Sequence, residues 1–349
     1  MSVTKKLFGT CPNGEEVYVY KITNNSGVSA EVMDFGAILV SMNVPDKNGK
    51  MTDVALGYAD FDSYIKYNCC FGATVGPNAN RIGSAQFVID GNTYQVDKND
   101  GANNLHSHLT EGFHRRVWKS EAGSNCVKFT LEEKDGMLGF PGNRVFTVTY
   151  TLTDSNRLEI HYNGESDANT IMNLTNHSYF NLKGAGHGDI EDHVLWMKAS
   201  NYTPVVKGGI PTGEIVPVAG TPMDFTTPTV VGKHINGDFE QIRLTGGYDH
   251  NWVIDDFDGS LQMFATVKAP DNGVVMKVYT NLPGVQFYAG NYIDEQEGKE
   301  GQIYRDRYGL CLETQFYPDT ANKPQFPSAV FGPDRIYDYT TVYEFGVES

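Results

Sequence analysis

Hydrophobic and polar residues alternate in short runs along much of the chain, and the runs are rich in β-branched and aromatic side chains. A period of two residues is typical of strands with one buried face. The clearest runs are EVYVYKI at 16–22, CVKFTL at 126–131, VFTVTYTL at 145–152, LEIHY at 158–162 and VVMKVYT at 274–280. Turn sequences such as KNGK, DGN, KDG and DNG lie between runs. We therefore predict an all-β protein.

Segments with helical periodicity and capping residues are hard to find, and 37 glycines with 15 prolines suit a chain that turns often. This pattern favours a β-sandwich or a barrel. Neither a repeat, a charge block nor a low-complexity linker marks a boundary, so we predict that residues 1–349 form a single domain. The segment DEQEGKEGQIYRDR at 294–307 is predicted to be one long exposed loop.

Composition narrows the possible partners and the compartment. The chain has 43 acidic and 27 basic residues and a net charge of −16, which argues against binding nucleic acid. Its five cysteines lack C-x-x-C spacing and are interpreted as free thiols in a reducing compartment. The N-terminus lacks the apolar core of a secretory signal, and no segment approaches the about 18 apolar residues of a membrane span. We predict a cytoplasmic monomer or homodimer.

Five segments carry more polar side chains than a strand or a turn requires. They are GPNANRIGSAQF at 76–87, NNLHSHLTEGF at 103–113, TNHSYFNL at 175–182, GYDHNWVI at 247–254 and CLETQFYPDTANKPQFPS at 311–328. Buried hydrogen bonds that tie loops to the sheets would explain any one of them. Together they combine Asn, Gln, Asp, Glu, His and Arg with aromatic residues, which is the chemistry that binds sugar hydroxyls and ring faces. The set predicts a site for a neutral sugar.

Six motifs, taken in order, resemble those of the aldose 1-epimerases, the galactose mutarotases. They are NANRI, NNLH followed by GF and RVW, TNHSYFNL, GYDHNWVI, LPGVQFYAGN, and LETQFYPD followed by NKPQFPS. The resemblance runs from about residue 8 to the C-terminus. One motif alone would be weak evidence, whereas six in the same order are specific.

The resemblance implies a large antiparallel β-sandwich of the galactose mutarotase-like supersandwich type, with few short helices and a sugar cleft. It implies an isomerase that interconverts the α and β anomers of free hexoses such as galactose and glucose without a cofactor. By position, Glu313 would be the general base and His177 the general acid. The remaining implied site residues are the sugar ligands Asn80, Arg81, His106, Asp249 and Gln286, with Tyr179 lining the pocket.

The chemistry of the reaction agrees with an acid and a base. Opening a sugar hemiacetal removes a proton from the anomeric hydroxyl and delivers one to the ring oxygen. Ordinary pKa values near 4.3 for Glu and 6.5 for His, together with a rise in the histidine pKa caused by the carboxylate, would keep Glu313 ionised and His177 protonated. We then expect a bell-shaped pH dependence of catalytic efficiency, and no metal ion.

Structural roles remain open for several of these residues. Arg81 suits a buried salt bridge that fixes its loop, Asp249 a turn that caps backbone amides, and Gln286 an ordinary strand amide. His106 and His108 would share one face if their segment were a strand. That spacing raises the alternative of a metal site, which Glu111 or His114 would complete.

The chain departs from the family pattern at Pro77, Ser107, His108, His114 and Arg115, which puts the loop beside His106 in question. Three further functions compete with a mutarotase. They are a glycoside hydrolase with Glu313 and Asp249 as its carboxylates, a non-catalytic sugar-binding module, and a hexose-6-phosphate 1-epimerase. Keeping both His177 and Glu313 argues against the binding module, and the acidic balance argues against a phosphorylated sugar.

Overall fold

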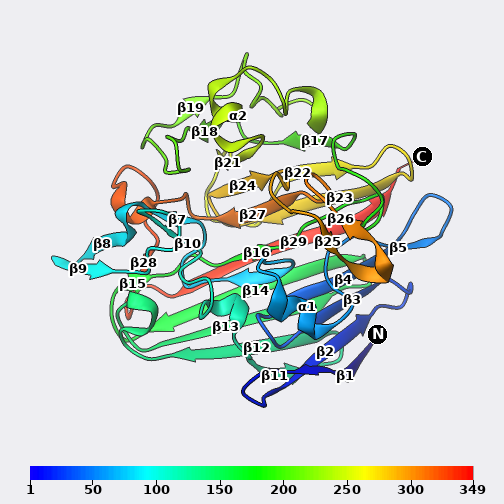
Figure 1. Cartoon of the computed structure of the whole chain (residues 1–349), viewed down its shortest axis with the longest axis horizontal. Helices are drawn as coiled ribbons and strands as arrows, with labels where there is room; N and C mark the ends of the chain where they lie inside the picture. The colour runs from blue at the N-terminus through cyan, green and yellow to red at the C-terminus, as the bar shows by residue number, and fades with distance from the viewer. Residues whose placement is uncertain (349) are drawn as a thin grey trace.

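The computed structural model describes residues 1–348 and consists mainly of antiparallel strands (Figure 1). The five predicted strands are confirmed as β2 (Glu16–Thr23), β12 (Cys126–Glu133), β13 (Arg144–Leu152), β14 (Arg157–Ser166) and β23 (Val274–Thr280). Within the described residues the α-helices are α1 (Phe61–Lys66) and α2 (Glu240–Thr245). Single 3₁₀ turns occur at Gly83–Ala85, Phe113–Arg115, Met137–Gly139, Val231–Lys233, Lys299–Gly301 and Thr320–Asn322.

The largest sheet has nine strands in the order β11-β12-β13-β14-β29-β23-β22-β17-β20. Its other strands are β11 (Lys119–Ala122), β17 (Val194–Met197), β20 (Thr229–Val230), β22 (Gln262–Lys268) and β29 (Tyr337–Val347). Buried positions alternate with less buried ones along β13 and β14, so that one face of this sheet packs on the core.

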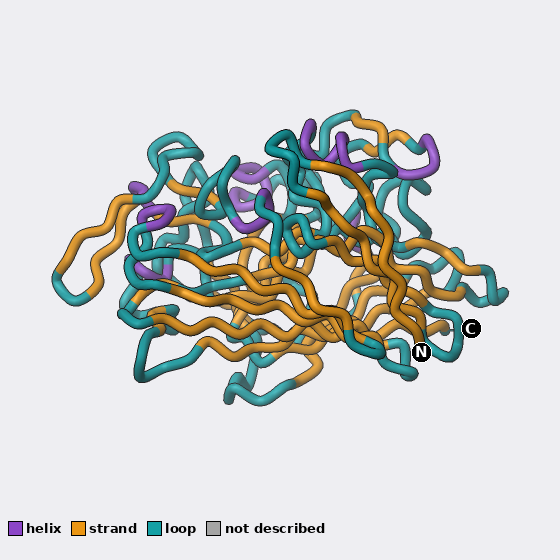
Figure 2. The backbone as a smooth tube through the Cα atoms, turned by 90° about the horizontal axis from the view of Figure 1, so that it is seen from below, coloured by secondary structure: helices purple, strands orange, loops and turns teal. Residues whose placement is uncertain are grey.

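Two five-stranded sheets accompany the large one. The first contains β1 (Ser2–Thr10), β2, β3 (Ser29–Met33), β4 (Ile38–Pro45) and β5 (Met51–Asp53). The second has the order β19 (Val216–Pro217), β18 (Asn201–Thr203), β21 (Asp249–Val253), β24 (Gly284–Tyr288) and β27 (Cys311–Gln315). In Figure 2 the long strands fill the lower part of the view, and most helical turns lie in its upper half. The architecture is the large antiparallel β-sandwich that was predicted.

Short two-stranded pairs complete the chain. They are β6 (Ala73–Val75) with β16 (Thr175–His177), β7 (Arg81–Ile82) with β10 (Asn104–Leu105), β8 (Gln86–Ile89) with β9 (Asn92–Gln95), β15 (Thr170–Ile171) with β28 (Val330–Phe331), and β25 (Gln296–Glu297) with β26 (Ile303–Tyr304). Two of these pairs, β6–β16 and β7–β10, carry residues of the predicted site.

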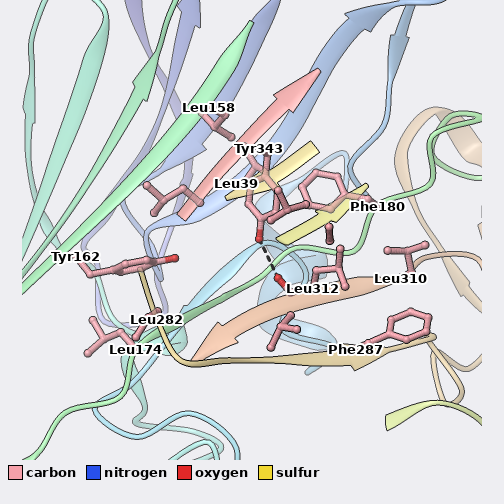
Figure 3. Packing of buried hydrophobic residues seen from close by; sticks show 14 of the residues in the cluster. Leu39, Leu158, Tyr162, Leu174, Phe180, Leu282, Phe287, Leu310, Leu312 and Tyr343 are labelled. Carbon is pink, nitrogen blue, oxygen red and sulfur yellow. Dashed lines mark hydrogen bonds between the residues drawn. The ribbon is translucent and has the colours of Figure 1, made fainter. Parts of the chain in front are cut away.

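One hydrophobic cluster joins the sheets behind β27. Phe180 packs on Tyr343 of β29 with ring centroids 4.9 Å apart, and both lie close to Leu312 (Figure 3). The hydroxyl of Tyr343 donates a hydrogen bond of 3.2 Å to the backbone carbonyl of Leu312. The nine-stranded sheet therefore supports the core-facing side of β27 directly.

His250 lies on the core-facing side of β21 and is fully buried beside Tyr202 and Trp252. Its Nδ1 accepts a hydrogen bond of 3.3 Å from the backbone N–H of Asp249. Burial lowers the pKa of His250 to about 3, so the ring is neutral in the folded protein. His250 is therefore a residue of the core packing rather than of the polar layer.

The variant His250→Asn should make the fold less sensitive to acid, because Asn keeps an acceptor at the δ position without a titratable ring. In the wild type, unfolding lets His250 bind a proton below a pH of about 6.5, so its neutral burial costs stability as the pH falls. Between pH 7 and pH 5 the free energy of unfolding should fall by about 2 kcal/mol less in the variant. Urea unfolding at both pH values measures this.

The exposed histidine variant His187→Asn tests whether removing any histidine has the same effect. Equal acid sensitivity of the wild type and His250→Asn would contradict a neutral, buried His250.

Candidate functional site

One face of the sheet that contains β27 carries most of the predicted polar residues. All five positions of β27 are buried. Because successive side chains of a strand point to opposite faces, Leu312 faces the core while Cys311 and Glu313 face the other side. Glu313 is paired with Gln286 of β24, and Asp249 of β21 is paired with Tyr288 of β24. The polar residues thus form a layer on the side away from Leu312.

His177 reaches the same place from β16, which packs near β27 close to the centre of the molecule (Figure 1). Its Nε2 lies 3.5 Å from Oε2 of Glu313. The imidazole stacks on the ring of Tyr179 with centroids 4.9 Å apart and an angle of 15° between planes. A histidine and a carboxylate that are 136 positions apart in the chain are therefore direct neighbours.

The pair β7–β10 holds Asn80 and His106 against each other. The backbone N–H of Asn80 donates to Nδ1 of His106, and the N–H of His106 donates to the carbonyl of Asn80, each over 3.0 Å. Both residues have positive φ values, 62° and 53°, which turn their side chains out of a regular strand. Because Nδ1 of neutral His106 is an acceptor, its proton lies on Nε2.

These elements enclose a cavity of about 580 Å³. Seven of the eight predicted site residues line it, namely Asn80, Arg81, His106, His177, Tyr179, Asp249 and Glu313. Gln286 does not line the cavity and instead donates a hydrogen bond of 2.7 Å to Oδ1 of Asp249. It therefore orients Asp249 from behind, which differs from the expected direct sugar ligand.

Several lining residues were missed by the sequence analysis, among them Lys66, Tyr67, Cys69, Cys70, Tyr288 and Tyr292. Tyr288 had a usable signal, since it follows Gln286 by two positions in the motif LPGVQFYAGN and so shares its face. The others lie on segments between strands, where no periodicity relates them to the motifs.

The segment 294–307, predicted to be one exposed loop, contributes its first residues to the cavity wall. Gln296 and Tyr304 are buried in the pair β25–β26, and residues 292–296 line the cavity. Lys299 forms an ion pair with Asp53 and donates to the carbonyl of Val40 over 2.8 Å. Most residues of the segment are exposed as predicted, but acidic and glycine-rich composition does not reveal the half-buried lysine that anchors the segment to β4 and β5.

Burial dominates the electrostatics of the acid–base pair, since Glu313 is 2% and His177 6% exposed. Loss of water lowers the pKa of His177 to about 3 and raises that of Glu313 well above its usual value. The negative charge of Asp249 raises the pKa of Glu313 further, while Arg81 lowers it in part. We expected the carboxylate to raise the histidine pKa, and desolvation reverses that direction.

The opposite shifts favour a neutral His177 beside a protonated Glu313. Above a pH of about 3, and up to the raised pKa of Glu313, the pair binds a single proton in total. Moving that proton from Glu313 to His177 creates a carboxylate and an imidazolium without exchange with solvent. The arrangement is thus one base and one acid that face the same space.

The metal alternative is not supported by the geometry around His106. His106, His177 and Glu313 each offer an atom within 4.8 Å of the others, but Nε2 of neutral His106 carries a proton and has no free lone pair. His106 and Ser107 both have positive φ values, so the chain does not alternate as a strand there. His108 instead accepts hydrogen bonds from the backbone of Thr110 and Glu111.

The structural roles considered for Arg81, Asp249 and Gln286 differ in how well the structure supports them. Nε of Arg81 donates to Asp100 over 2.8 Å, so the expected loop salt bridge exists, although Arg81 also lines the cavity. Asp249 belongs to strand β21 rather than to a turn. Gln286 bonds to the side chain of Asp249, so it is more than a strand amide paired with backbone.

Two of the departures from the family pattern, Ser107 and Arg115, stabilise loops. The hydroxyl of Ser107 accepts from the N–H of Asn78 and donates to its carbonyl, each over 2.9 Å. Arg115 donates to the backbone carbonyls of Tyr64 and Ile65 over 2.7 and 2.9 Å. The Ser107 contacts fix the loop that carries His106, and the Arg115 contacts fix the last turn of α1.

Comparisons with known proteins agree with the fold and with the family resemblance. The family model described as aldose 1-epimerase matches residues 18–344. Galactose mutarotase from Rattus norvegicus is 38% identical over 99% of both chains, and aldose 1-epimerase from Escherichia coli is 36% identical over 97% of both. The crystal structure of galactose 1-epimerase from Lactobacillus acidophilus is 26% identical and covers 100% of both chains with a TM-score of 0.86.

The imidazole of His177 should remain neutral at pH 5, where an ordinary histidine is mostly protonated. The pH titration of its Cε1–H chemical shift, assigned by comparison with His177→Asn, should have its midpoint below a pH of about 4, because the buried site disfavours the charged ring. A midpoint near a pH of about 6.5 would contradict desolvation as the dominant effect.

Proposed function

The chain belongs to the aldose 1-epimerase family, and we propose that Glu313 is the general base and His177 the general acid of its reaction. The enzyme is an isomerase that interconverts the α and β anomers of free hexoses such as galactose and glucose, and thereby serves hexose metabolism. The observation that carries the assignment is the 3.5 Å approach of Nε2 of His177 to Oε2 of Glu313 at the cavity wall.

Ring opening follows from this pair. Glu313 removes the proton of the anomeric hydroxyl, and Nε2–H of His177 protonates the ring oxygen as the bond between that oxygen and the anomeric carbon breaks. Rotation about the bond between the first two carbons presents the other face of the aldehyde. The same two protons then move back as the ring closes, so that the enzyme is regenerated without a covalent intermediate.

Binding of the sugar brings the shared proton to its working position. The anomeric hydroxyl donates a hydrogen bond, which favours the carboxylate form of Glu313, while the ring oxygen accepts one, which favours the protonated imidazole. Because the pair already holds the single proton that this form needs, activity does not depend on an ordinary histidine titration near neutral pH.

The other residues bind and orient the sugar in this proposal. Nε2–H of His106 and the guanidinium of Arg81 donate to hydroxyls, while Asp249, fixed by Gln286, accepts from them. The aromatic rings of Tyr179 and Tyr288 line the same cavity and provide apolar surface for the sugar ring. Asn80 contributes by holding His106 in place and by lining the cavity.

The remaining properties are part of the same proposal. No helix within residues 1–348 has the length and hydrophobicity that crossing a bilayer requires. We propose one domain over 1–349, supported by the larger of two core clusters, whose members extend from Tyr20 to Phe345. Five free cysteines support a cytoplasmic location, and the net charge of −16 argues against a nucleic acid partner. A monomer or homodimer is part of the same proposal.

The competing functions have less support. Apart from histidines, the described cationic residues that line the cavity are Lys66 and Arg81. Because Arg81 is paired with Asp100, little positive charge is left to bind the phosphate group of a sugar phosphate. A hydrolase that used Glu313 and Asp249 would leave His177 beside Glu313 without a role. A binding module would need neither member of the acid–base pair.

Polarimetry on freshly dissolved α-D-galactose and α-D-glucose tests the proposal. Glu313→Gln and His177→Asn should each lower the enzymatic rate by about 10²- to 10⁴-fold, since each removes one proton-transfer group. Glu295→Gln, which changes an acidic side chain elsewhere on the cavity lining, should keep most of the activity and is the matched control.

Two other results would contradict the assignment. Wild-type rates in both variants would point to a different acid and base. A wild type that accelerates neither sugar, with or without chelator treatment, would point to a binding module or to another substrate. Sugar phosphates and glycosides would then be tested.

The catalytic efficiency should show no titration at the ordinary histidine pKa of about 6.5, in place of the narrow bell that ordinary pKa values suggest. The pair keeps its one proton around this pH, so activity should fall only in stronger acid, as His177 and Glu313 bind a second proton, or in stronger base, as the shared proton leaves. Initial rates at low galactose concentration give the profile. A midpoint near a pH of about 6.5 would contradict it.

A further inference from the structure

Cys311 touches the proposed acid and has no role in the reaction described so far. It lies on β27 two positions before Glu313, so both side chains project from the same face of the strand. Its side chain is fully buried, and Sγ lies 3.5 Å from Nδ1 of His177. The two ring nitrogens of His177 thus have partners from one strand, Cys311 at Nδ1 and Glu313 at Nε2.

The proposed reaction requires one fixed orientation of the His177 ring, and packing alone does not provide it. His177 must release and regain the proton on Nε2 while Nδ1 keeps its own proton. Stacking on Tyr179 restrains the tilt of the imidazole, but a ring turned by a half rotation about its Cβ–Cγ bond would stack equally well. A polar partner at Nδ1 distinguishes the two orientations.

We propose that Cys311 is a positioning residue whose sulfur accepts the Nδ1–H of His177 and thereby keeps Nε2 directed at Glu313 and the sugar. The inference rests on the proposed function, because it assigns Nε2 as the atom that gives up the proton. A thiol sulfur is a weak acceptor, which suffices to select one ring orientation.

A weak acceptor at Nδ1 also keeps the protonated ring a good proton donor. A carboxylate at Nδ1 would stabilise the protonated ring strongly and make it a poorer acid toward the weakly basic ring oxygen. Burial raises the pKa of the Cys311 thiol well above its usual value, so this partner stays uncharged. Cys311 therefore orients the acid without reducing its acidity. The competing explanation is that Cys311 only fills space beside His177.

The state of the ring nitrogens can be read in the unmodified enzyme. Nitrogen-15 NMR of histidine-labelled wild type, assigned with His177→Asn, should show neutral His177 with its proton on Nδ1 at pH 7. A neutral ring with its proton on Nε2 would overturn the proposal. This measurement does not depend on how any cysteine variant folds.

Kinetics of two substitutions test the consequence. Cys311→Ala should lower kcat about 10-fold and change KM less than about 2-fold, since misorientation of the acid affects the proton transfer more than sugar binding. Cys311→Ser, which restores an acceptor, should recover most of kcat. Cys11→Ala, a buried cysteine that does not line the cavity, is the control and should retain wild-type kinetics.

Wild-type kcat in Cys311→Ala would overturn the proposal, as would equal losses in the Ala and Ser variants, which would indicate packing alone. Failure of the proposed function gives a different result, namely a wild type without mutarotase activity. The ring tautomer of His177 is measurable in that case too, so the two failures are distinguishable.

Discussion

The site depends on one constraint, the removal of a histidine and a carboxylate from water at a distance of 3.5 Å from each other. Each charged form is unfavourable alone in such a place, whereas the pair with one shared proton is neutral overall. The rest of the molecule has to exclude water from this pair and still admit a sugar. The cavity satisfies both demands because its base is closed by strands and its rim by segments that include 292–296.

Strand β27 links the hydrophobic core to the acid–base pair. Leu312 is held from the core side by Tyr343 of the nine-stranded sheet, while Cys311 and Glu313 on the opposite side meet His177. A shift of this strand would therefore change the packing and the acid–base geometry together. The ion pair between Lys299 and Asp53 ties the rim segment to the first sheet, so the enclosure relies on contacts between distant parts of the chain.

Local patterns account for the parts of the fold that were predicted correctly. Alternation along single strands identified β13 and β14, and the motifs located seven residues that line the cavity. The role of Gln286 was missed because its contact with Asp249 depends on how β21 and β24 are paired. The direction of the His177 pKa was missed because desolvation depends on every group around the ring.

Period, turn chemistry and residue type are local properties, and they were enough to indicate the all-β class, the positions of the clearest strands and the kinds of side chain that meet a sugar. The burial of β27 on both faces, the folding of segment 294–307 over the cavity, and the contacts of His177 with Cys311 and Glu313 became visible in the folded chain alone. These features arise from contacts between elements that are separate in the sequence, as His177 and Glu313 are, and no local pattern contains their burial or proton affinity.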